Sequence, residues 1–357
     1  MYLCTENLNM PITNINLALS NRCNATCIWC PTSRGTKHNF DMPFETVKKI
    51  IDEASSKEFP YKIGMIHLSE NGEALYNKDF LDIVRYIKVK LPYTAINLLS
   101  NFGLMSPKIS KVLLQEKLLS SIQVNIDGHD SKSYTAVKGI SYLGVIKNLK
   151  RFLKLRAEFD PNFNISINVM PAFEYAVTVN AFMRTEPDQY KEPIPFSTYE
   201  HTLASLRKFV PGDIYIKRSM PGLWAERKLI TSGKATINID QSTLDCPLLF
   251  RVENEVFIAP NGDLYPCCND DNNDIVLGNV NEASLMEIHN SETRKVFIDR
   301  LKAHKYEEIG YPCNTVLCCQ VVSIKKNDLD NITSSYKLGD SISIVKDRII
   351  PIKAIKI

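Results

Sequence analysis

Three cysteines, Cys23, Cys27 and Cys30, stand within eight residues near the start of this sequence. They follow an apolar run, Ile15–Leu19, that reads as a β-strand. Thiols this close together can pair as disulfides, bind zinc or bind an iron–sulfur cluster. Structural zinc normally takes four protein ligands, often as a cysteine pair that is repeated later in the chain. Three close thiolates without a nearby fourth suit an iron–sulfur cluster that leaves one iron open to another ligand.

A second group of cysteines lies in the last third of the chain. Its members are Cys246, Cys267, Cys268, Cys313, Cys318 and Cys319. Thiols that converge from two ends of one small segment predict a second metal site. An iron–sulfur cluster and a structural zinc ion are the two alternatives for it.

Length and composition bound the class of protein. The 357 residues suit one large domain plus a smaller one, and 44% hydrophobic with 23% charged residues is ordinary for a globular protein. A net charge of +3 gives no reason to expect nucleic acid or an anionic membrane as a partner. The sequence shows neither a secretory signal nor a membrane-spanning run. Ten cysteines without such a signal indicate a reducing compartment, so we expect a cytoplasmic protein.

The elements that must position the first cysteines alternate between strands and helices. Helical periodicity predicts Phe44–Ala54, Phe80–Leu91 and Ile109–Leu119. The predicted strands are Ile15–Leu19, Ile63–Leu68, Ala95–Leu99, Ile122–Ile126, Phe163–Val169 and Ile214–Ile216. Six β–α units of this kind predict a parallel sheet with right-handed crossovers.

The composition of the sequence changes after these units. Phe182–Thr198 is rich in proline and charge and reads as a long loop, either a lid or a surface insertion, before a helix near Tyr199–Phe209. A domain boundary is expected near Thr231, and Asn261–Asp263 reads as a turn between short strands. We therefore expect domains at 14–230 and 231–320, and a tail at 321–357 with a small strand pair.

The first cysteine motif resembles that of the radical S-adenosylmethionine (radical SAM) superfamily. The three cysteines are separated by three and then two residues, and aromatic Trp29 directly precedes Cys30. The resemblance implies that Cys23, Cys27 and Cys30 hold a 4Fe–4S cluster, that SAM binds its fourth iron, and that Trp29 lies against the adenine. It also implies a partial (β/α)6 barrel with its site at the carboxyl ends of the strands.

Motifs after the predicted strands continue the resemblance. The stretch Ser69–Glu73 resembles the Gly-Gly-Glu element that holds the SAM amino group, which implies SAM contacts for Asn71, Gly72 and Glu73. A carboxylate facing an ammonium gains a charge-assisted hydrogen bond, and a glycine permits close backbone approach. Here Asn71 replaces the first glycine of the family pattern.

Four further positions carry expectations for SAM binding. Asn101 follows the third strand as in a Thr-Asn-Gly motif, and Asn125 takes the place of a ribose-contacting serine. Lys138 stands where relatives often carry the arginine that pairs with the SAM carboxylate, although a lysine lacks the bidentate geometry. Arg218, at the end of the sixth strand, is a cation that could hold SAM or an anionic substrate group.

The second cysteine group resembles the SPASM/twitch extension of radical SAM enzymes. Cys246, Gly262 and Cys267 match its opening frame, and six cysteines suit the shorter twitch form with one auxiliary 4Fe–4S cluster. The resemblance implies Cys246, Cys267 and Cys313 as ligands, with Cys318 or Cys319 as the fourth. Cys268 is then surplus and could return a hydrogen atom to a substrate radical. The expected fold is therefore α/β, a partial radical SAM barrel followed by a small α+β domain.

The implied chemistry is reductive cleavage of SAM to a 5′-deoxyadenosyl radical that takes a hydrogen atom from a substrate C–H bond. Electrons would come from a flavodoxin- or ferredoxin-type partner. An electron-accepting auxiliary cluster would give dehydrogenation, hydrogen return from Cys268 would give epimerisation, and bond formation would suit crosslinking of a ribosomal peptide. Only some twenty residues precede the Cys23–Cys30 motif, too few for a domain that recognises a leader peptide. We therefore expect a sugar or aminocyclitol substrate, with a peptide as the alternative. A non-enzymatic iron–sulfur or zinc protein is the rival from another class.

Overall fold

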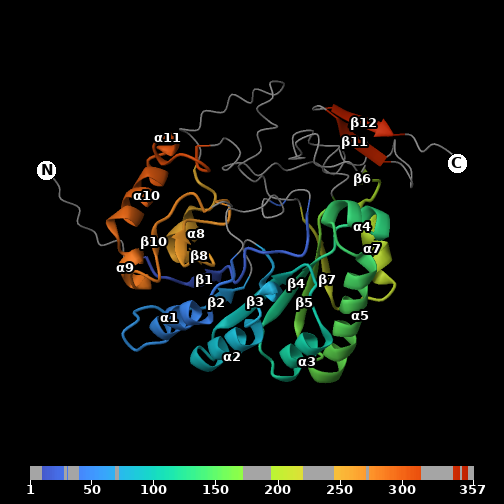
Figure 1. Ribbon diagram of the computed structural model, residues 1–357, viewed down its shortest axis with the longest axis horizontal. Coiled ribbons are helices and arrows are strands. Elements are labelled where there is room, and N and C mark those ends of the chain that lie inside the picture. The colour runs from blue at the N-terminus through green and yellow to red at the C-terminus, as the bar shows by residue number, and fades with distance from the viewer. Residues whose placement is uncertain are drawn as a thin grey trace.

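The computed structural model describes residues 10–27, 30, 40–68, 72–171, 194–219, 245–270, 273–314, 341–345 and 348–352 (Figure 1). The predictions for Trp29, Asn71, Cys318 and Cys319 lie outside these residues. The same holds for the expected boundary near Thr231 and for all but the end of the proline-rich loop.

One nine-stranded sheet organises the molecule, in the order β10-β9-β8-β1-β2-β3-β4-β5-β7. From β8 to β7 all neighbours pair in parallel, and β8, β9 and β10 pair antiparallel. The six strands predicted from the sequence are all present. They are β1 (Asn14–Leu17), β2 (Met65–His67), β3 (Ala95–Ser100), β4 (Ser121–Asn125), β5 (Asn164–Val169) and β7 (Tyr215–Arg218).

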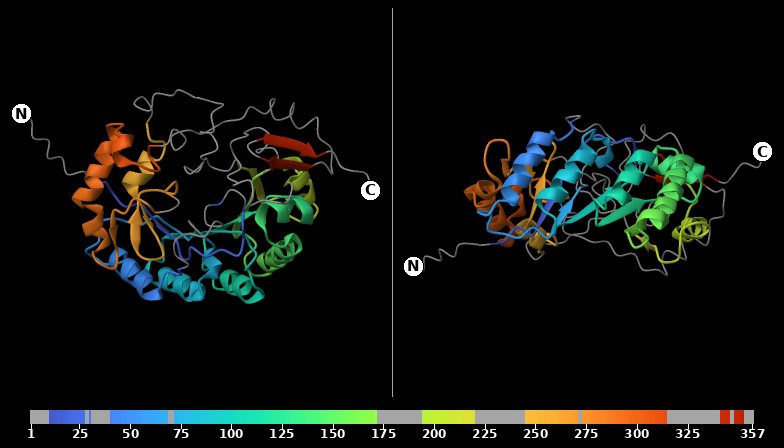
Figure 2. Two further views of the ribbon diagram at one scale, coloured as in Figure 1. Left: turned by 45° about the horizontal axis from the view of Figure 1, so that its top comes forward. Right: turned by 90° about the horizontal axis from the view of Figure 1, so that it is seen from below.

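Helices cover the outside of the curved sheet (Figure 2). They are α1 (Phe44–Ala54), α2 (Phe80–Lys90), α3 (Pro107–Gln115), α4 (Ser131–Lys138), α5 (Tyr142–Phe159) and α7 (Tyr199–Arg207), with a 3₁₀ turn, η2, at Ala74–Tyr76. The first two lie within one residue of their predicted bounds. Helix α3 begins earlier than its apolar period suggests, because Ser106 caps it by accepting from the Ile109 amide and Pro107 is suited to the first turn.

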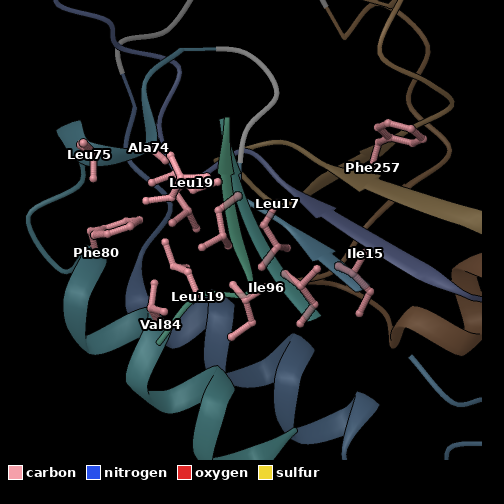
Figure 3. Packing of buried hydrophobic residues seen from close by; sticks show 14 of the residues in the cluster. Ile15, Leu17, Leu19, Ala74, Leu75, Phe80, Val84, Ile96, Leu119 and Phe257 are labelled. Carbon is pink, nitrogen blue, oxygen red and sulfur yellow. The ribbon is translucent and has the colours of Figure 1, made fainter. Parts of the chain in front are cut away.

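The strands are apolar on one face and largely polar on the other, where Met65, Leu99 and Phe257 are apolar exceptions among the paired residues. Ile15, Leu17 and Ile96 are buried toward the helices, whereas Phe257 points to the opposite side (Figure 3). In β4 the apolar Ile122 and Val124 are buried while the polar positions between them are partly exposed. A parallel sheet that is covered on both faces shows no such alternation. The sheet is therefore packed on its outer face and presents polar side chains on its inner face.

The second cysteine segment adds strands to this sheet rather than standing apart from it. Strand β8 (Glu255–Ile258) pairs in parallel with β1, so the parallel sheet extends beyond the six expected units. The expected turn at Asn261–Asp263 joins β8 to β9 (Asp263–Tyr265), and Gly262 adopts a φ of 91° there. The remaining elements are α8 (Leu249–Asn254), β10 (Gly278–Asn279), α9 (Leu285–His289), α10 (Glu292–Lys302) and α11 (Tyr306–Ile309).

The strand pair expected in the tail is present. Strands β11 (Ser341–Val345) and β12 (Arg348–Ile352) pair antiparallel, and β11 also pairs with β6 (Ile194–Pro195). The three strands form a separate small sheet beside α4 and α7 (Figure 1).

Candidate active site

The loop that carries Cys23 and Cys27 is fixed at its base by polar contacts. Ser20 Oγ and Arg22 Nε donate to Asp41 Oδ1 at 2.6 and 3.0 Å. The Arg22 guanidinium also lies 4.5 Å from the centre of the Tyr76 ring. Because β1 ends at Leu17, these contacts place the loop directly beyond the carboxyl end of that strand.

The segment after β2 packs against the same loop. The Glu73 amide donates to the Arg22 carbonyl oxygen at 2.9 Å. Gly72 has a φ of 95°, and a Cβ there would lie 2.1 Å from the Ser20 carbonyl oxygen. Only a glycine fits so close to the Ser20 carbonyl oxygen. The glycine that was predicted to contact SAM is therefore needed for the packing of the cysteine loop itself.

Glu73 is buried and turns toward the end of β3. Its carboxylate accepts from Ser100 Oγ at 2.8 Å and from the Asn101 amide at 2.9 Å. Burial raises the pKa of Glu73, and these hydrogen bonds oppose that rise. The carboxylate therefore ties the second and third βα junctions together.

Asn101 reaches the cysteine loop directly. Its Nδ2 donates to Asn24 Oδ1 at 2.9 Å and lies 3.6 Å from Cys23 Sγ. Gly103 leaves room for this contact, since a Cβ there would lie 2.3 Å from Asn24 Nδ2. The predicted cofactor residue thus lies beside a predicted cluster ligand.

The end of α4 holds the next part of the loop. The Thr26 amide donates to the Lys138 carbonyl oxygen at 2.9 Å. Gly139 ends the helix with a φ of 68°, and a Cβ there would lie 1.8 Å from Thr26 Oγ1. The loop thus crosses the carboxyl ends of β2, β3 and β4, which is where the barrel prediction places the site.

Lys138 forms an ion pair with Asp127 that is withdrawn from solvent. Its Nζ lies 2.9 Å from Asp127 Oδ2, and the two side chains are 3% and 0% exposed. Burial lowers the pKa of Lys138, but the Asp127 carboxylate outweighs it and holds that pKa well above its usual range. Asp127 Oδ1 also accepts from the Met170 amide at 2.9 Å, which links the ends of β4 and β5.

The three thiols of the first motif are neighbours. Burial raises the pKa of Cys23 to about 11 and that of Cys27 to about 12, and each thiol also responds to the charge of Cys30. In the described part of the chain no three His, Cys, Asp or Glu side chains stand close enough to hold a metal ion already. Because the thiolate is the form that binds metal, loading a cluster must displace the thiol protons. Three thiols on one loop are nonetheless the donor set of an iron–sulfur cluster with an open position, so these residues fit the group that the sequence implies.

The inner face of the sheet continues from this loop. Asn125 Oδ1 is buried and has no hydrogen-bond partner among the described residues, which fits the predicted contact with a ligand hydroxyl. Arg218 lies elsewhere: its guanidinium is 5.7 Å from the centre of the Tyr199 ring of α7. Register with Asn168 instead puts Lys217 on the inner face. Lys217 is the cation that the register puts on the inner face, and the role expected for Arg218 stays a prediction.

A charged network lies on the inner face where β8 meets β1. Glu255 accepts from Arg251 at 2.8 Å, from Asn16 at 3.0 Å and from Asn14 at 3.2 Å. Arg251 also donates to Cys268 Sγ at 3.4 Å. Cys268 is half-buried, and this contact connects it to the polar inner face of the sheet.

The other described cysteines of the second group join the core of that segment. Cys267 and Cys313 are buried in the hydrophobic cluster, and Cys246 packs against it. Cys246 precedes α8, Cys267 follows β9 and Cys313 follows α11, so the thiols come from three neighbouring parts of the segment. Cys267 and Cys268 are adjacent in sequence, yet one is buried and the other is partly exposed.

Reasoning from motifs missed the inner-face residues. They are Asn14, Asn16, His67, Asn97, Ser121, Gln123, Ser166, Asn168, Lys217 and Glu255. The signal for most of them was the alternation of polar and apolar residues in the predicted strands, although Met65 and Leu99 interrupt it and Glu255 lies outside those strands. Arg251 gave no such signal, because it lies on the short helix α8 and only the folded chain brings its side chain into contact with Glu255.

Two family models match the chain. Residues 17–172 match the radical SAM superfamily, and residues 246–315 match SPASM, an iron–sulfur cluster-binding domain. The chain is thus a radical SAM protein with a C-terminal SPASM domain. These two domains imply SAM, a 4Fe–4S cluster and auxiliary iron–sulfur clusters as cofactors.

Individual proteins resemble the chain at lower identity. The probable GTP 3′,8-cyclase of Pyrococcus horikoshii is 25% identical over 265 residues, which cover 71% of this chain and 79% of that protein. The structure of BtrN with AdoMet and 2-DOIA aligns with a TM-score of 0.50 and 15% identity, over 95% of this chain and 98% of BtrN. Streptococcus suis SuiB bound to its precursor peptide SuiA has a TM-score of 0.50 and 14% identity, over 79% of this chain and 65% of SuiB.

The two solved structures confirm the predicted α/β fold. Among the described residues, every helix is too short or too polar to cross a membrane.

Proposed function

We propose that this radical SAM enzyme dehydrogenates or epimerises a polar small molecule of the sugar or aminocyclitol type. When bound, the cluster and SAM supply a carbon radical that takes a hydrogen atom from a substrate C–H bond, and an auxiliary cluster supplies an electron acceptor. The chain's own residues must then bind, orient and shield the substrate.

The observation that carries the proposal is the polar inner face of the sheet. Amides dominate it, with Lys217 and the Glu255–Arg251 pair at its two ends. Amide, hydroxyl and carboxylate groups recognise hydroxyls and amines by hydrogen bonding. A substrate with many such groups could hydrogen-bond to this surface, including the buried Asn125 Oδ1, which has no partner among the described residues, whereas an apolar substrate could not.

Cys23, Cys27 and Cys30 would hold the first cluster, and Cys246, Cys267 and Cys313 would contribute ligands to an auxiliary one. Cys268 differs from these, because its sulfur accepts a hydrogen bond from Arg251 beside the inner face. This contact supports Cys268, among the cysteines that the structure describes, as the one that gives a hydrogen atom to a substrate radical in the epimerase branch. The resulting thiyl radical would then need one electron and one proton from the external reductant and solvent.

A second candidate is bond formation within a nucleotide. It is favoured by the similarity to the probable GTP 3′,8-cyclase, which extends over 71% of this chain. The inner face is compatible with a ribose, and Lys217 offers a cation for phosphate.

The test is transfer of deuterium from substrate to 5′-deoxyadenosine. The reconstituted enzyme is incubated with SAM, a low-potential reductant and one C-deuterated compound at a time: an aminocyclitol, a hexosamine, GTP or a short peptide. We expect label to transfer from the aminocyclitol or the hexosamine. Transfer from GTP alone would favour the cyclase, and transfer from the peptide alone would favour peptide modification. Either result would overturn the proposal.

Two sets of variants separate the roles of the cysteines. Iron per chain should be about eight and fall to about four when Cys23, Cys27 and Cys30 are all changed to Ala. About four irons in the wild type, falling to about zero, would remove the electron-accepting auxiliary cluster and the dehydrogenase branch with it. Cys268→Ser should still cleave SAM but form no epimer if the thiol returns the hydrogen atom. Unchanged epimer formation would end that role.

A further inference from the structure

The Asp127–Lys138 ion pair is buried although burial of charge is costly. Its partners come from two elements, the end of β4 and the last residue of α4. Replacing such a pair by apolar residues often leaves stability unchanged or improved, so stability alone does not explain its presence. Its location suggests another role, because the Lys138 carbonyl oxygen binds the Thr26 amide between two predicted cluster ligands.

A second observation connects this pair to the cysteine loop. Tyr134 lies one turn before Lys138, is 0% exposed, and its hydroxyl has no hydrogen-bond partner in the described part of the chain. The positive charge of Lys138 lowers the pKa of Cys23, Cys27 and Tyr134, against the larger rise that burial causes in each. Tyr134 and Lys138, four residues apart, share one face of α4, and both are buried in the helix whose end holds the loop.

We propose that the Asp127–Lys138 pair positions the cysteine loop and sets the reduction potential of the cluster that the loop holds. The inference rests on the proposed function. It differs from the expectation that Lys138 binds the SAM carboxylate. To reach a ligand the ammonium would have to leave Asp127, its partner at 2.9 Å, and its buried position. The pair is a positioning element rather than a catalytic one.

The physical basis is the charge that a cluster gains on reduction. Adding one electron adds one negative charge, and a nearby cation in a poorly solvated site favours that state. Loss of the ammonium should lower the reduction potential, and loss of the Asp127 carboxylate should raise it. A purely structural disturbance has no reason to move the two variants in opposite directions.

The experiment is a reductive titration without SAM, followed by electron paramagnetic resonance. The relevant signal is the one that disappears when Cys23, Cys27 and Cys30 are changed to Ala. We expect a more negative midpoint potential for Lys138→Met, a more positive one for Asp127→Asn, and a value near wild type for the double variant. Lys132→Met removes an exposed lysine from the same helix and should leave the potential unchanged.

Because SAM is absent, a role of Lys138 in SAM binding alone would leave all the potentials unchanged, and that result would overturn the inference. Shifts of the same sign in both single variants would overturn it as well. If Lys138→Met fails to retain iron, two variants that keep a cation at position 138 still test the inference. The midpoint potential should rise in Asp127→Asn and stay near the wild-type value in Lys138→Arg. If the Cys23/Cys27/Cys30 variant loses no signal, the proposed function itself fails.

Discussion

Glu73 shows how a single residue can match a motif and yet point elsewhere than the motif suggests. The sequence predicts a carboxylate that faces the SAM ammonium. In the structure both carboxylate oxygens face the protein, toward Ser100 and the Asn101 amide, and the side chain is buried. We therefore predict that Glu73 contributes to SAM binding indirectly, through the positions of Asn101 and the cysteine loop.

Substitution of Glu73 can separate the effect of its negative charge from the effect of the hydrogen bonds that it accepts. Glu73→Ala leaves two buried donors unpaired, at a cost of about 1–3 kcal/mol each, and should weaken SAM binding at least about tenfold. Glu73→Gln can still pair with both groups but carries no charge, so we expect SAM affinity within about threefold of wild type. Equilibrium dialysis with labelled SAM measures both, and Glu45→Gln on the exposed side of α1 is the control. Equal damage by Gln and Ala would mean that the charge itself contacts SAM.

At the scale of elements, the site is built by segments that approach one another closely at glycines. The turn after β2 meets the backbone of the cysteine loop at Gly72, and the end of α4 meets the same loop at Gly139. These contacts explain why glycines of the motifs stand beside the predicted cluster and SAM ligands in this chain. The sequence shows their presence, but only the fold shows that Gly72 approaches the Ser20 backbone and Gly139 the Thr26 side chain.

Gly72→Ala should therefore displace the cysteine loop. A Cβ at this position would meet the Ser20 carbonyl oxygen at 2.1 Å, and the φ of 95° adds strain of about 1–3 kcal/mol. We expect the variant to fold with lower stability and to lose the iron assigned to Cys23, Cys27 and Cys30. Iron analysis and urea unfolding measure these two effects.

The matched control is Gly64→Ala, at the start of the same β–α unit. Its added Cβ would meet only the Thr13 carbonyl oxygen, at the ordinary distance of 3.6 Å. Iron content and stability should stay near wild type, within about 0.5 kcal/mol. Equal iron in Gly72→Ala and Gly64→Ala would contradict the role of the close approach.

At the scale of the whole molecule, the sequence predicts the barrel well and the joining of its two parts poorly. Apolar alternation locates the strands and helices of the first domain, because their pattern is local. The parallel pairing of β8 with β1 is not local: Asn14 lies opposite Glu255, 241 residues later in the chain. Likewise Glu53 of α1 accepts from the Leu285 and Met286 amides at the start of α9. Neither contact leaves a signal in a single sequence.

His289 belongs to the same junction and makes it sensitive to acid. It is buried, and its Nε2 lies 2.7 Å from the Met10 carbonyl oxygen that precedes β1. Burial, with the nearby charge of Arg294, lowers the pKa of His289 from 6.5 to about 4. In the unfolded chain this histidine takes up a proton below pH 6.5, whereas in the folded protein it remains neutral until about pH 4. The contribution of His289 to the free energy of unfolding is therefore complete above pH 6.5, and it is lost progressively as the pH falls toward 4.

At about 1.4 kcal/mol per pKa unit, the loss over this window should be roughly 3 kcal/mol. His289→Gln keeps a donor for the Met10 carbonyl but cannot titrate, so its free energy of unfolding should fall less between pH 7 and pH 4.5 than that of the wild type. Urea unfolding at a series of pH values measures the difference, and the acid sensitivity that both proteins share cancels. Parallel slopes for wild type and His289→Gln would show that the junction between the two domains does not depend on a neutral histidine.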